Sequence, residues 1–493
     1  MRLRPRGRAI AAAMTLVAAL ASPGLASAET LTVAQAIGRA AAQNPTLRAS
    51  LEDVQAAHLS TQAEIDGRDP TLSATVQGGY SENASGTNVN GAGTVSSKVA
   101  VSYTTDVGTR LEVGTSADLG WRPSANGSAS AAPQLTALAY VTARQPLLRG
   151  AGKDVNTSSI VNAQFGETQA KKQQELTASS TALDVLDAYW ELWYADRAVE
   201  VQEDARRVAA KDYEDAEARL GQLGTGTEID VLQFSSSLAS IEDQLSQAKA
   251  TRTTRAVALG RLLGMDAKSS AELEPTDSLP MLPAIGTEDA LVSSALDGSP
   301  DLASLRAGID SAKLRVDTAI DADQPQLDLF ATGQVGTQFA NYGGDYTLLG
   351  ARPVFSLVGG LSLELPLGSG SAPSERARAV AQLHAAQDRY QAKVDQIVAD
   401  VASKRVDALS AASGVRLAEK TVDVSRRLAK AEQDKFALGT GDASDVVKAE
   451  ESVREAELRL LRARVDAVTG GYALEHATGS LLDGAGAAMR SSS

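Results

Sequence analysis

The sequence predicts an exported α+β membrane protein in which one unit of helices and strands occurs twice. Three observations lead to this prediction: an N-terminal export signal, sequence blocks that recur in a fixed order, and alternating segments that precede long helical segments. The chain has 493 residues and no cysteine. Disulfides, thiolate metal sites and lipid attachment through an N-terminal cysteine are therefore excluded.

Residues 1–28 have the pattern of a cleavable export signal. Four arginines precede an apolar stretch at 9–21, and the small-residue sequence Ala26-Ser27-Ala28 follows. A membrane-anchoring helix is the alternative, but the apolar run is short and Pro23 and Gly24 interrupt it. Loss of the four arginines changes the net charge from −14 to −18. Such an acidic chain lacks the basic patches that a nucleic-acid partner requires.

Beyond the signal, no apolar run approaches the roughly 18 residues that a spanning helix needs. Backbone polar groups inside a bilayer must all be hydrogen-bonded within the protein. A chain of this kind can therefore cross a membrane only as a closed barrel of strands. Two classes remain at this point: a soluble periplasmic protein and an outer-membrane barrel.

Four blocks of the first half recur in the same order in the second half. The matched pairs are 32–47 with 287–302, 69–79 with 324–334, 143–152 with 364–373, and 223–232 with 438–447. The first two pairs share an offset of 255 residues, and within the third pair an offset of 220 residues aligns Pro146 with Pro366. A repeat of this length indicates one structural unit used twice.

Each unit is expected to begin with helices, at 29–69 in the first half and at 285–324 in the second. Thr32 has the position of a helix N-cap, and the chain turns at Asn44-Pro45 before a second helix that ends near Asp66.

Alternation of apolar and polar residues predicts strands in 70–146 and again in 325–366. From Pro70 to Pro146 the first region spans 76 residues, and from Pro325 to Pro366 the second spans 41. The difference of 35 residues is enough for one additional hairpin with generous loops.

Long helix pairs are expected at 147–284, with a tip loop near 221–230, and at 367–480, with a tip loop near 437–445. Residues 151–222 would extend roughly 108 Å as one unbroken helix. The returning segments have heptad spacing, with alanine at successive core positions of the second copy, which implies close helix contacts. An ordinary coiled-coil dimer would account for the heptads, but not for the strands or the repeat. A flexible tail is expected at 481–493.

Catalytic and cofactor motifs are nearly absent. The three histidines lie far apart in the sequence. The stretch GAGKD at 150–154 lacks the earlier glycine of a phosphate loop and has Asp154 in place of its Ser or Thr. We therefore expect no enzyme, no cofactor and no metal site.

Several short strings carry a family resemblance when they are taken together. They are QPLLRG at 145–150, the Asn-Pro turn after the first helix, the paired LGTG loops, DAYWELWYA at 187–195 and RLLG at 261–264. In order and spacing they resemble the outer membrane efflux protein family, the trimeric channel-tunnels typified by TolC. The resemblance covers residues 30–480, nearly the whole mature chain.

The resemblance implies an internally duplicated protomer whose strands join those of two further protomers in a transmembrane β-barrel. Each protomer would give four strands to a shared barrel of twelve, and a long periplasmic α-helical barrel would continue it. The protein would be an outer-membrane exit duct of a tripartite efflux or type I secretion system. It would conduct cargo passively, without a cofactor, in contact with outer-membrane lipid. The implied partners are a periplasmic adaptor and an inner-membrane transporter of the RND, ABC or MFS type.

Within this resemblance, Pro146 and Pro366 would mark the passages from strand to helix, with Gly150 and Gly368 easing the bend. Proline lacks the N–H that a strand ladder needs, and its fixed φ suits the start of a helix. An ordinary loop proline is the alternative.

The two tip loops are the other candidate sites. The resemblance implies contact with the adaptor at Leu223, Gly224, Thr225, Leu438, Gly439 and Thr440. It also implies a gate in which Asp445 forms a ring of carboxylates and Asp230 helps to hold the channel shut, with Lys448 where family members have a second acidic ring. Helix N-capping is the alternative role of both aspartates.

The lock of this gate departs from the family pattern. Phe436 and Gly441 stand where family members have a tyrosine and an arginine that hold the gate shut, and neither can form those polar bonds. Either the resting gate is looser in this chain, or other contacts close it.

The additional hairpin also departs from the family pattern. We expect it to be an extracellular or peripheral extension, and the alternative is a barrel of more than twelve strands. Two other functions remain open: a periplasmic coiled-coil adaptor or scaffold protein without channel activity, and an outer-membrane adhesin or stalk.

Overall fold

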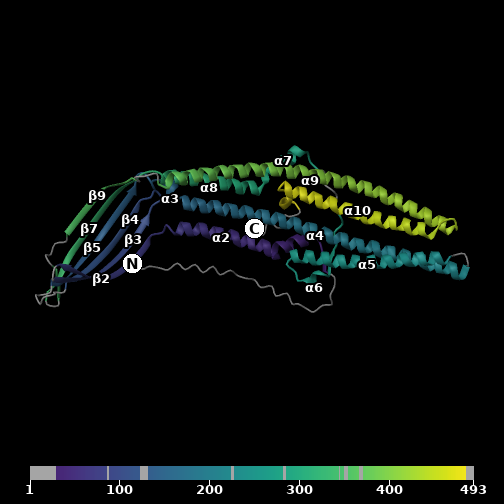
Figure 1. Ribbon diagram of the computed structural model, residues 1–493, viewed down its shortest axis with the longest axis horizontal. Helices are drawn as coiled ribbons and strands as arrows, with labels where there is room; N and C mark the ends of the chain where they lie inside the picture. Colours follow the sequence, from purple (N-terminus) through teal and green to yellow (C-terminus); the bar gives the residue numbers. More distant parts are fainter. Residues whose placement is uncertain are drawn as a thin grey trace.

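The computed structural model describes residues 29–85, 88–122, 131–223, 227–280, 285–342, 345–348, 354–365 and 370–484. The molecule is elongated: a curved sheet lies at one end, and long helices run from it to the other end (Figure 1).

The order of helices is the same in both halves of the chain, and so, nearly, are their lengths. In the first half these helices are α1 (Val33–Gln43), α2 (Pro45–Asp66), α4 (Ser158–Ala218) and α5 (Glu228–Leu262), with 11, 22, 61 and 35 residues. In the second half they are α7 (Glu288–Gly298), α8 (Pro300–Ala322), α9 (Ala372–Ala437) and α10 (Ala443–Ala477), with 11, 23, 66 and 35 residues. Short elements complete the described helices: α3 (Lys153–Asn156), α6 (Ala267–Ser270), a π-helical turn (Arg219–Leu223) and a 3-10 turn (Leu481–Asp483).

The first two helices begin at polar caps. Thr32 and Gln35 form a reciprocal capping box, in which each side chain accepts from the other residue's backbone N–H, at 3.3 and 2.9 Å. The Asn44 side chain then accepts from the N–H groups of Thr46 and Leu47, and Pro45 occupies the first turn of α2. Helix α1 therefore ends where α2 starts, because one asparagine serves both ends.

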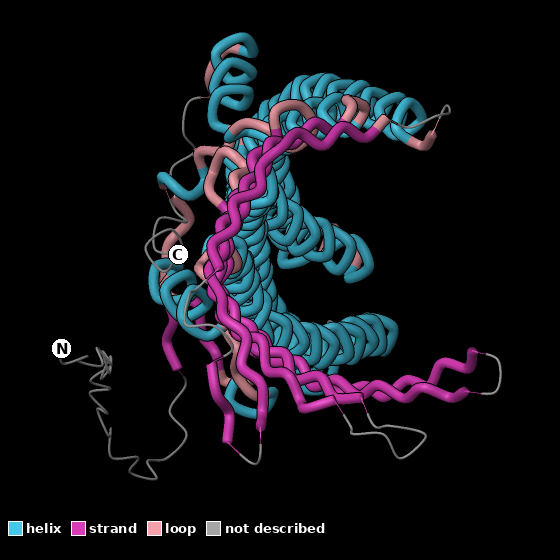
Figure 2. The backbone as a smooth tube through the Cα atoms, turned by 90° about the vertical axis from the view of Figure 1, so that its left-hand side faces the viewer, coloured by secondary structure: helices cyan, strands magenta, loops and turns pink. Residues whose placement is uncertain are grey.

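The main sheet has six long antiparallel strands. In spatial order they are β2 (Thr71–Ser85), β3 (Asn88–Thr104), β4 (Arg110–Arg122), β5 (Ala131–Pro146), β7 (Gln326–Tyr342) and β9 (Val354–Glu364). A short strand, β8 (Asp345–Leu348), pairs with the far end of β7. Viewed end-on, the sheet is an arc (Figure 2).

The additional hairpin of the first half consists of β2 and β3 and lies inside this sheet. We expected an extracellular or peripheral extension, and that prediction was wrong: β3 pairs with β4 through twelve consecutive residue pairs, from Thr104↔Arg110 to Gly93↔Trp121. The four strands per protomer that the resemblance implied are likewise too few. Alternation shows which face a residue occupies but not which strand is its neighbour, so the sequence could not place the hairpin.

Two features of the structure were not predicted from the sequence: a small parallel sheet and an ordered turn near the C-terminus. A small parallel pair joins β1 (Glu29–Leu31) to β6 (Leu273–Pro275). Leu481 is fully buried in the main core, so the expected flexible tail is ordered at its start, while residues 485–493 lie outside the described part.

The main core lies where α1, α4, the β1–β6 pair and the C-terminal turn meet. Its largest fully buried side chains are Tyr189 and Trp190 of α4, which pack edge to face at 5.2 Å. The Tyr189 hydroxyl donates to the Leu31 carbonyl oxygen at 2.9 Å, and the Trp193 indole donates to the Asp277 carbonyl oxygen at 3.0 Å. These bonds tie α4 to both segments that flank the small sheet.

Helices lie side by side along the length of the molecule. Helix α2 packs on α4, α4 on α8, and α8 on α9, while α5 returns along α4 and α10 along α9 (Figure 1). At 1.5 Å per residue the 61 residues of α4 extend about 92 Å. None of the described helices has an apolar stretch long enough to cross a bilayer.

Candidate functional site

The passage from β5 to α4 begins at Pro146, the last residue of the strand, which pairs with Asp328. Two backbone N–H groups beyond Pro146 still bond to the start of β7 and the residue before it. The Leu147 N–H donates to the Leu327 oxygen at 2.7 Å, and the Arg149 N–H donates to the Pro325 oxygen at 3.3 Å. Pro146 was expected to mark the passage from strand to helix; it ends the strand, and helical structure begins at Lys153, with a break at Thr157 before α4. Backbone bonds to the base of β7 therefore continue as far as Arg149, and the bend follows them.

Glycine makes this bend possible. Gly150 has φ +80° and Gly152 has φ +96°, in the left-handed region that favours glycine. The Gly150 N–H donates to both carboxylate oxygens of Asp321, at 2.9 and 3.1 Å. The Asn156 side chain donates to the carbonyl oxygens of both glycines, at 2.8 and 2.7 Å. The predicted role of Gly150 in easing the bend thus has a geometric basis.

The turn between β3 and β4 packs into the same passage. Gly108, with φ +89°, lies so close to Gly150 that a Cβ atom would stand 2.6 Å from the Gly150 carbonyl oxygen. The Arg68 guanidinium donates to the Asn156 oxygen at 2.6 Å and to the Thr105 oxygen at 3.1 Å, and it pairs with the Asp106 carboxylate at 3.4 Å. The base of the additional hairpin is therefore fastened to both neighbouring helices.

The second passage and part of the first tip loop cannot be compared with the sequence prediction. Pro366, Gly368, Gly224 and Thr225 lie outside the described residues, and for Leu223 only the backbone, in the π-helical turn, is described.

At the start of α5, Asp230 belongs to a capping box. Thr227 is the N-cap, and the Asp230 carboxylate accepts from its N–H at 3.1 Å and from its hydroxyl at 2.7 Å. The Thr227 hydroxyl in turn accepts from the Asp230 N–H at 3.2 Å. Asp230 therefore has a role in capping the start of the helix, and its side chain is half-buried at the tip.

The second tip loop presents its predicted residues to solvent. The Leu438 side chain is 80% exposed, and Gly439 has φ +76°. The Thr440 N–H donates to the Lys435 oxygen at 3.0 Å and closes the end of α9. In the first turn of α10, the exposed Asp445 and Lys448 lie one helical turn apart, with 3.8 Å between Nζ and Oδ1.

An aromatic cluster that sequence reasoning missed joins the two helix pairs at the tip. Phe234 of α5 and Phe436 of α9 pack edge to face at 5.7 Å, and the Arg219 guanidinium lies 4.9 Å from the Phe436 ring centre. Ala443 and Val446 of α10 are buried in the same cluster. The heptad position of Phe234 was the available indication. Phe436 thus makes apolar and cation–π contacts where the family pattern has a polar lock.

Two half-buried carboxyl groups, Asp212 of α4 and Glu450 of α10, face each other deeper in the tip region. Burial raises the pKa of both groups, and the neighbouring Asp212 carboxylate raises the pKa of Glu450 further. Gln433 of α9 donates to Glu450 at 2.6 Å. Three helices therefore meet at one acidic pair that favours a shared proton.

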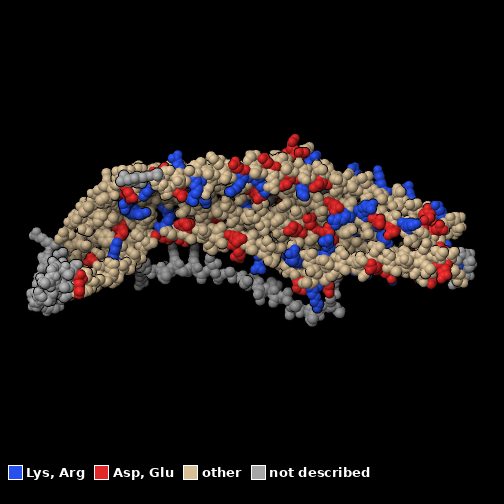
Figure 3. Space-filling view, in the orientation of Figure 1, with Lys and Arg blue, Asp and Glu red and all other residues tan. Residues whose placement is uncertain are grey.

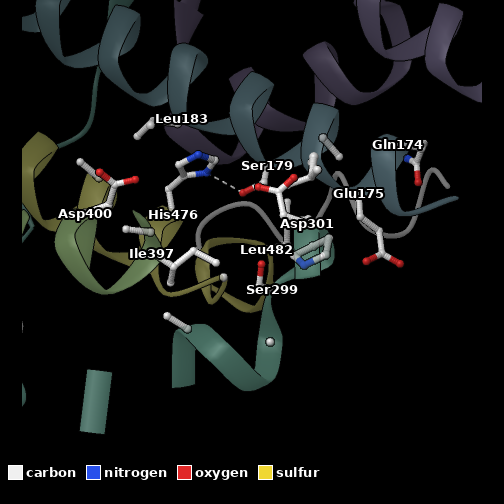
Figure 4. Close-up of a pocket in the computed structure, with 18 of the residues that line it drawn as sticks. Gln174, Glu175, Ser179, Leu183, Ser299, Asp301, Ile397, Asp400, His476 and Leu482 are labelled. Atoms are coloured by element: carbon white, nitrogen blue, oxygen red, sulfur yellow. Dashed lines mark hydrogen bonds between the residues drawn. The ribbon is translucent and has the colours of Figure 1, made fainter. Parts of the chain in front are cut away.

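A cavity of about 990 Å³ lies at mid-length, between α4, α9, α10 and the start of α8 (Figure 4). His476 and Ser179 point toward each other across it, with 2.8 Å between Nδ1 and Oγ (Figure 4). Burial lowers the pKa of His476. Burial also raises the pKa of the cavity-lining Asp187 to about 6, to which the nearby Asp184 and Glu191 carboxylates add.

This cavity has mixed charge rather than a ligand set. Lys393 pairs with Asp301 at 2.6 Å on its wall. Among the described residues no group of three or more acidic, histidine or cysteine side chains is placed to hold a metal ion. On the visible face of the molecule, charged side chains of both signs gather over the helices, and few lie over the sheet (Figure 3).

Comparison with known proteins shows one family to which part of the chain is similar. The family model described as "Outer membrane efflux protein" matches residues 291–480, from α7 to the end of α10. The alkaline protease secretion protein AprF of Pseudomonas aeruginosa is 26% identical over 302 residues, which are 60% of this chain and 61% of AprF. The chain thus matches about three fifths of the length of this curated relative.

The second half of the chain is thus similar to the outer membrane efflux protein family. Solved structures agree in fold. The outer-membrane channel OprN has a TM-score of 0.67 and 18% identity, with 91% of this chain and 90% of that one covered. The CmeC outer membrane channel of Campylobacter jejuni has a TM-score of 0.69 and 14% identity, with 91% and 86% covered. The printed descriptions of both structures are of outer-membrane channels.

Proposed function

We propose that this protein is the exit duct of a tripartite efflux or type I secretion system. It works as a homotrimer that receives cargo from an inner-membrane transporter of the RND, ABC or MFS type through a periplasmic adaptor. The observation that carries the proposal is the direct continuation of one curved sheet into a layer of helices about 90 Å long. A protein with this shape can join an outer-membrane pore to partners far inside the periplasm.

The faces of the sheet support a pore. Apolar side chains on one face are exposed in the protomer, among them Val113, Val141 and Val335. The opposite face is polar: Lys98 pairs with Glu112 at 2.8 Å, and the Tyr140 hydroxyl donates to Glu112 at 2.6 Å. One face suited to lipid and one to water is the pattern of an outer-membrane barrel.

Conduction through such a duct requires no chemistry from the chain. The described residues supply capping boxes, aromatic contacts and ion pairs at the positions that a gate would use, and the relatives' printed names describe channels and secretion. Asp230, Asp445 and Lys448 are the proposed gate residues. Leu223, Gly224, Thr225, Leu438, Gly439 and Thr440 form the proposed adaptor-docking loops.

A periplasmic coiled-coil adaptor or scaffold is the weaker candidate, because six long strands with an exposed apolar face have no use in a soluble protein.

Planar-bilayer recording of protein purified from outer membranes tests the proposal. We expect stable ion-conducting steps without nucleotide or cofactor, from a species that native mass spectrometry identifies as a trimer. Recovery only from the soluble periplasmic fraction, with no conductance after reconstitution, would show that the protein is not a duct.

A further inference from the structure

We infer that three copies of the chain close a barrel of eighteen long strands, in which β2 of one protomer pairs with β9 of the next. The inference rests on the proposed trimeric duct and specifies how its wall is joined. Six strands from each of three copies give the eighteen.

The two edge strands of the sheet, β2 and β9, are oriented so that β2 of one copy can pair with β9 of another. Within the described chain β2 pairs only with β3, and β9 only with β7, so each has one side whose backbone groups face no strand. Successive long strands alternate in direction, and with six of them β2 and β9 run opposite ways. A second copy placed edge to edge therefore continues the antiparallel ladder, and head-to-tail repetition closes a ring.

The apolar face extends without interruption across the additional hairpin to the β2 edge. The pairings place one row of residues across all six long strands: Leu72, Val101, Val113, Val141, Gly333 and Leu357. The two ends of this row are the most exposed, at 71% for Leu72 and 69% for Leu357. Apolar side chains at both edges are therefore left open in one protomer, as expected where the neighbouring copy and lipid cover them.

The other face of β2 is polar, as it is in the rest of the sheet. Thr71, Ser73, Thr75 and Gln77 alternate with the apolar positions, and the Thr71 and Ser102 hydroxyls lie 2.8 Å apart. The additional strands thus have the same two-faced pattern as the strands of the second half, β7 and β9. A hairpin lying outside the barrel would not need a lipid-facing side.

The base of the hairpin is fixed at the same level as the other strands. Arg68 and Gly108 fasten the β3–β4 turn to the β5–α4 passage, and Gly152 donates to the Val107 oxygen at 3.4 Å. Moving β2 and β3 aside to free β4 as the joining edge would break these contacts and the twelve residue pairs between β3 and β4.

The widths of the two layers also agree with six strands. Four neighbouring helices at 8–10 Å spacing occupy roughly 32–40 Å of circumference. Six strands spaced by about 4.8 Å and tilted by about 40° occupy roughly 38 Å, whereas four would occupy roughly 25 Å. The six-stranded sheet therefore covers the layer formed by α2, α4, α8 and α9 without a gap.

Cysteine cross-linking tests the joint, and the natural chain has no cysteine to interfere. Ala74→Cys on the apolar face of β2 is combined in turn with Gly359→Cys, Leu361→Cys and Leu363→Cys, which share the corresponding face of β9. The matched control replaces Ala74→Cys by Thr115→Cys, which lies in the same row on β4. Within one protomer both positions are too many strands from β9 for a disulfide, so any product joins two copies.

The variants are oxidised mildly in intact outer membranes and run on non-reducing denaturing gels, with trimer content measured separately by native mass spectrometry. We expect covalent trimers from at least one Ala74 combination and none from the Thr115 combinations. Cross-linking through Thr115 alone, or through neither position, in a protein that is trimeric would overturn the inference and leave the duct intact. A monomer without cross-links would overturn both.

Discussion

Gly108 and Gly150 meet at the base of the sheet, where each has a positive φ and a Cβ on Gly108 would lie 2.6 Å from the Gly150 carbonyl oxygen. The contact joins the β3–β4 turn to the passage between strand and helix. The additional hairpin and the helical layer are therefore coupled through two backbone segments with no side chain between them.

Substitution of these two glycines separates strain from packing. Gly150→Ala meets only the Pro146 Cβ atom at 3.9 Å, so we expect a loss of about 1–2 kcal/mol from the left-handed backbone alone. Gly108→Ala adds contacts with the Gly150 oxygen and with the Asn156 amide at 2.7 Å, and should cost clearly more. Urea unfolding in detergent measures both. Equal losses would mean that the passage yields easily and that the close contact does not fasten the hairpin.

The first helices and the passage after β5 differ in how much of their structure the local sequence determines. Thr32, Asn44 and Pro45 indicated the first two helices because capping depends on a few neighbouring residues. The passage was placed at Pro146, but the helix begins seven residues later at Lys153. The bend before it depends on the Asp321 carboxylate, which accepts from the Gly150 N–H and lies 171 residues away in the sequence, so local spacing does not reveal it.

The candidate site likewise has some features that the local sequence predicts and others that arise only in the folded chain. The exposed positions of Asp445 and Lys448 follow from their place in the first turn of a helix. The cluster of Phe234, Phe436 and Arg219 does not, because its members come from three helices that meet only after the chain folds. The gate roles of Asp445 and Lys448 stay predictions from the family resemblance.

Asp187 should make stability depend on pH between about 4 and 6. Burial raises its pKa from 3.8 to about 6, Asp184 and Glu191 add to the rise, and Lys404 opposes it. The folded state therefore binds the proton more tightly than the unfolded state. The stabilisation is complete below about pH 4 and is lost as pH rises through about 6.

Asp187→Asn should remove this dependence and raise the free energy of unfolding at pH 7. The two-unit shift sets an upper limit near 3 kcal/mol, and partial exposure reduces the expected gain to about 1–2 kcal/mol. Urea unfolding at pH 4 and pH 7 measures the difference, with Asp204→Asn at an exposed carboxylate farther along the same helix as the matched control. A gain that is the same at both pH values would assign the effect to packing instead of charge.

Phe234 should hold the two helix pairs together at the tip. Its side chain is 2% exposed, and Phe234→Ala leaves a cavity beside Phe436, Ala443 and Val446. Truncation of a buried phenylalanine typically costs about 3–5 kcal/mol. We expect faster hydrogen exchange at the start of α10 and a larger fraction of open time in bilayer recordings.

Two variants on the same helix interpret this result. Phe234→Leu keeps most of the buried volume and should change exchange little. Leu232→Ala removes a side chain that is 62% exposed and should leave the tip unchanged. If Leu232→Ala opened the channel as much as Phe234→Ala, the aromatic contact would not be what closes it.

Asp445 should attract cations at the constriction. A ring of three carboxylates raises the local cation concentration, as acidic rings do in cation channels. Asp445→Asn should therefore lower the preference for K⁺ over Cl⁻, measured as a shift of the reversal potential toward zero in a KCl gradient. Lys448→Gln should move it the other way, because the ammonium group lies 3.8 Å from the Asp445 carboxylate and opposes its charge.

The control for this pair keeps the charge change but moves it to another helix. Asp434→Asn in α9 removes an exposed carboxylate near the same tip, whose partner Lys430 lies 4.0 Å away. Screening limits the reach of an exposed charge to about 8–10 Å at physiological salt, so a residue outside the constriction should alter selectivity little. An unchanged reversal potential in Asp445→Asn would remove Asp445 from the gate and leave it a residue of the first helical turn only.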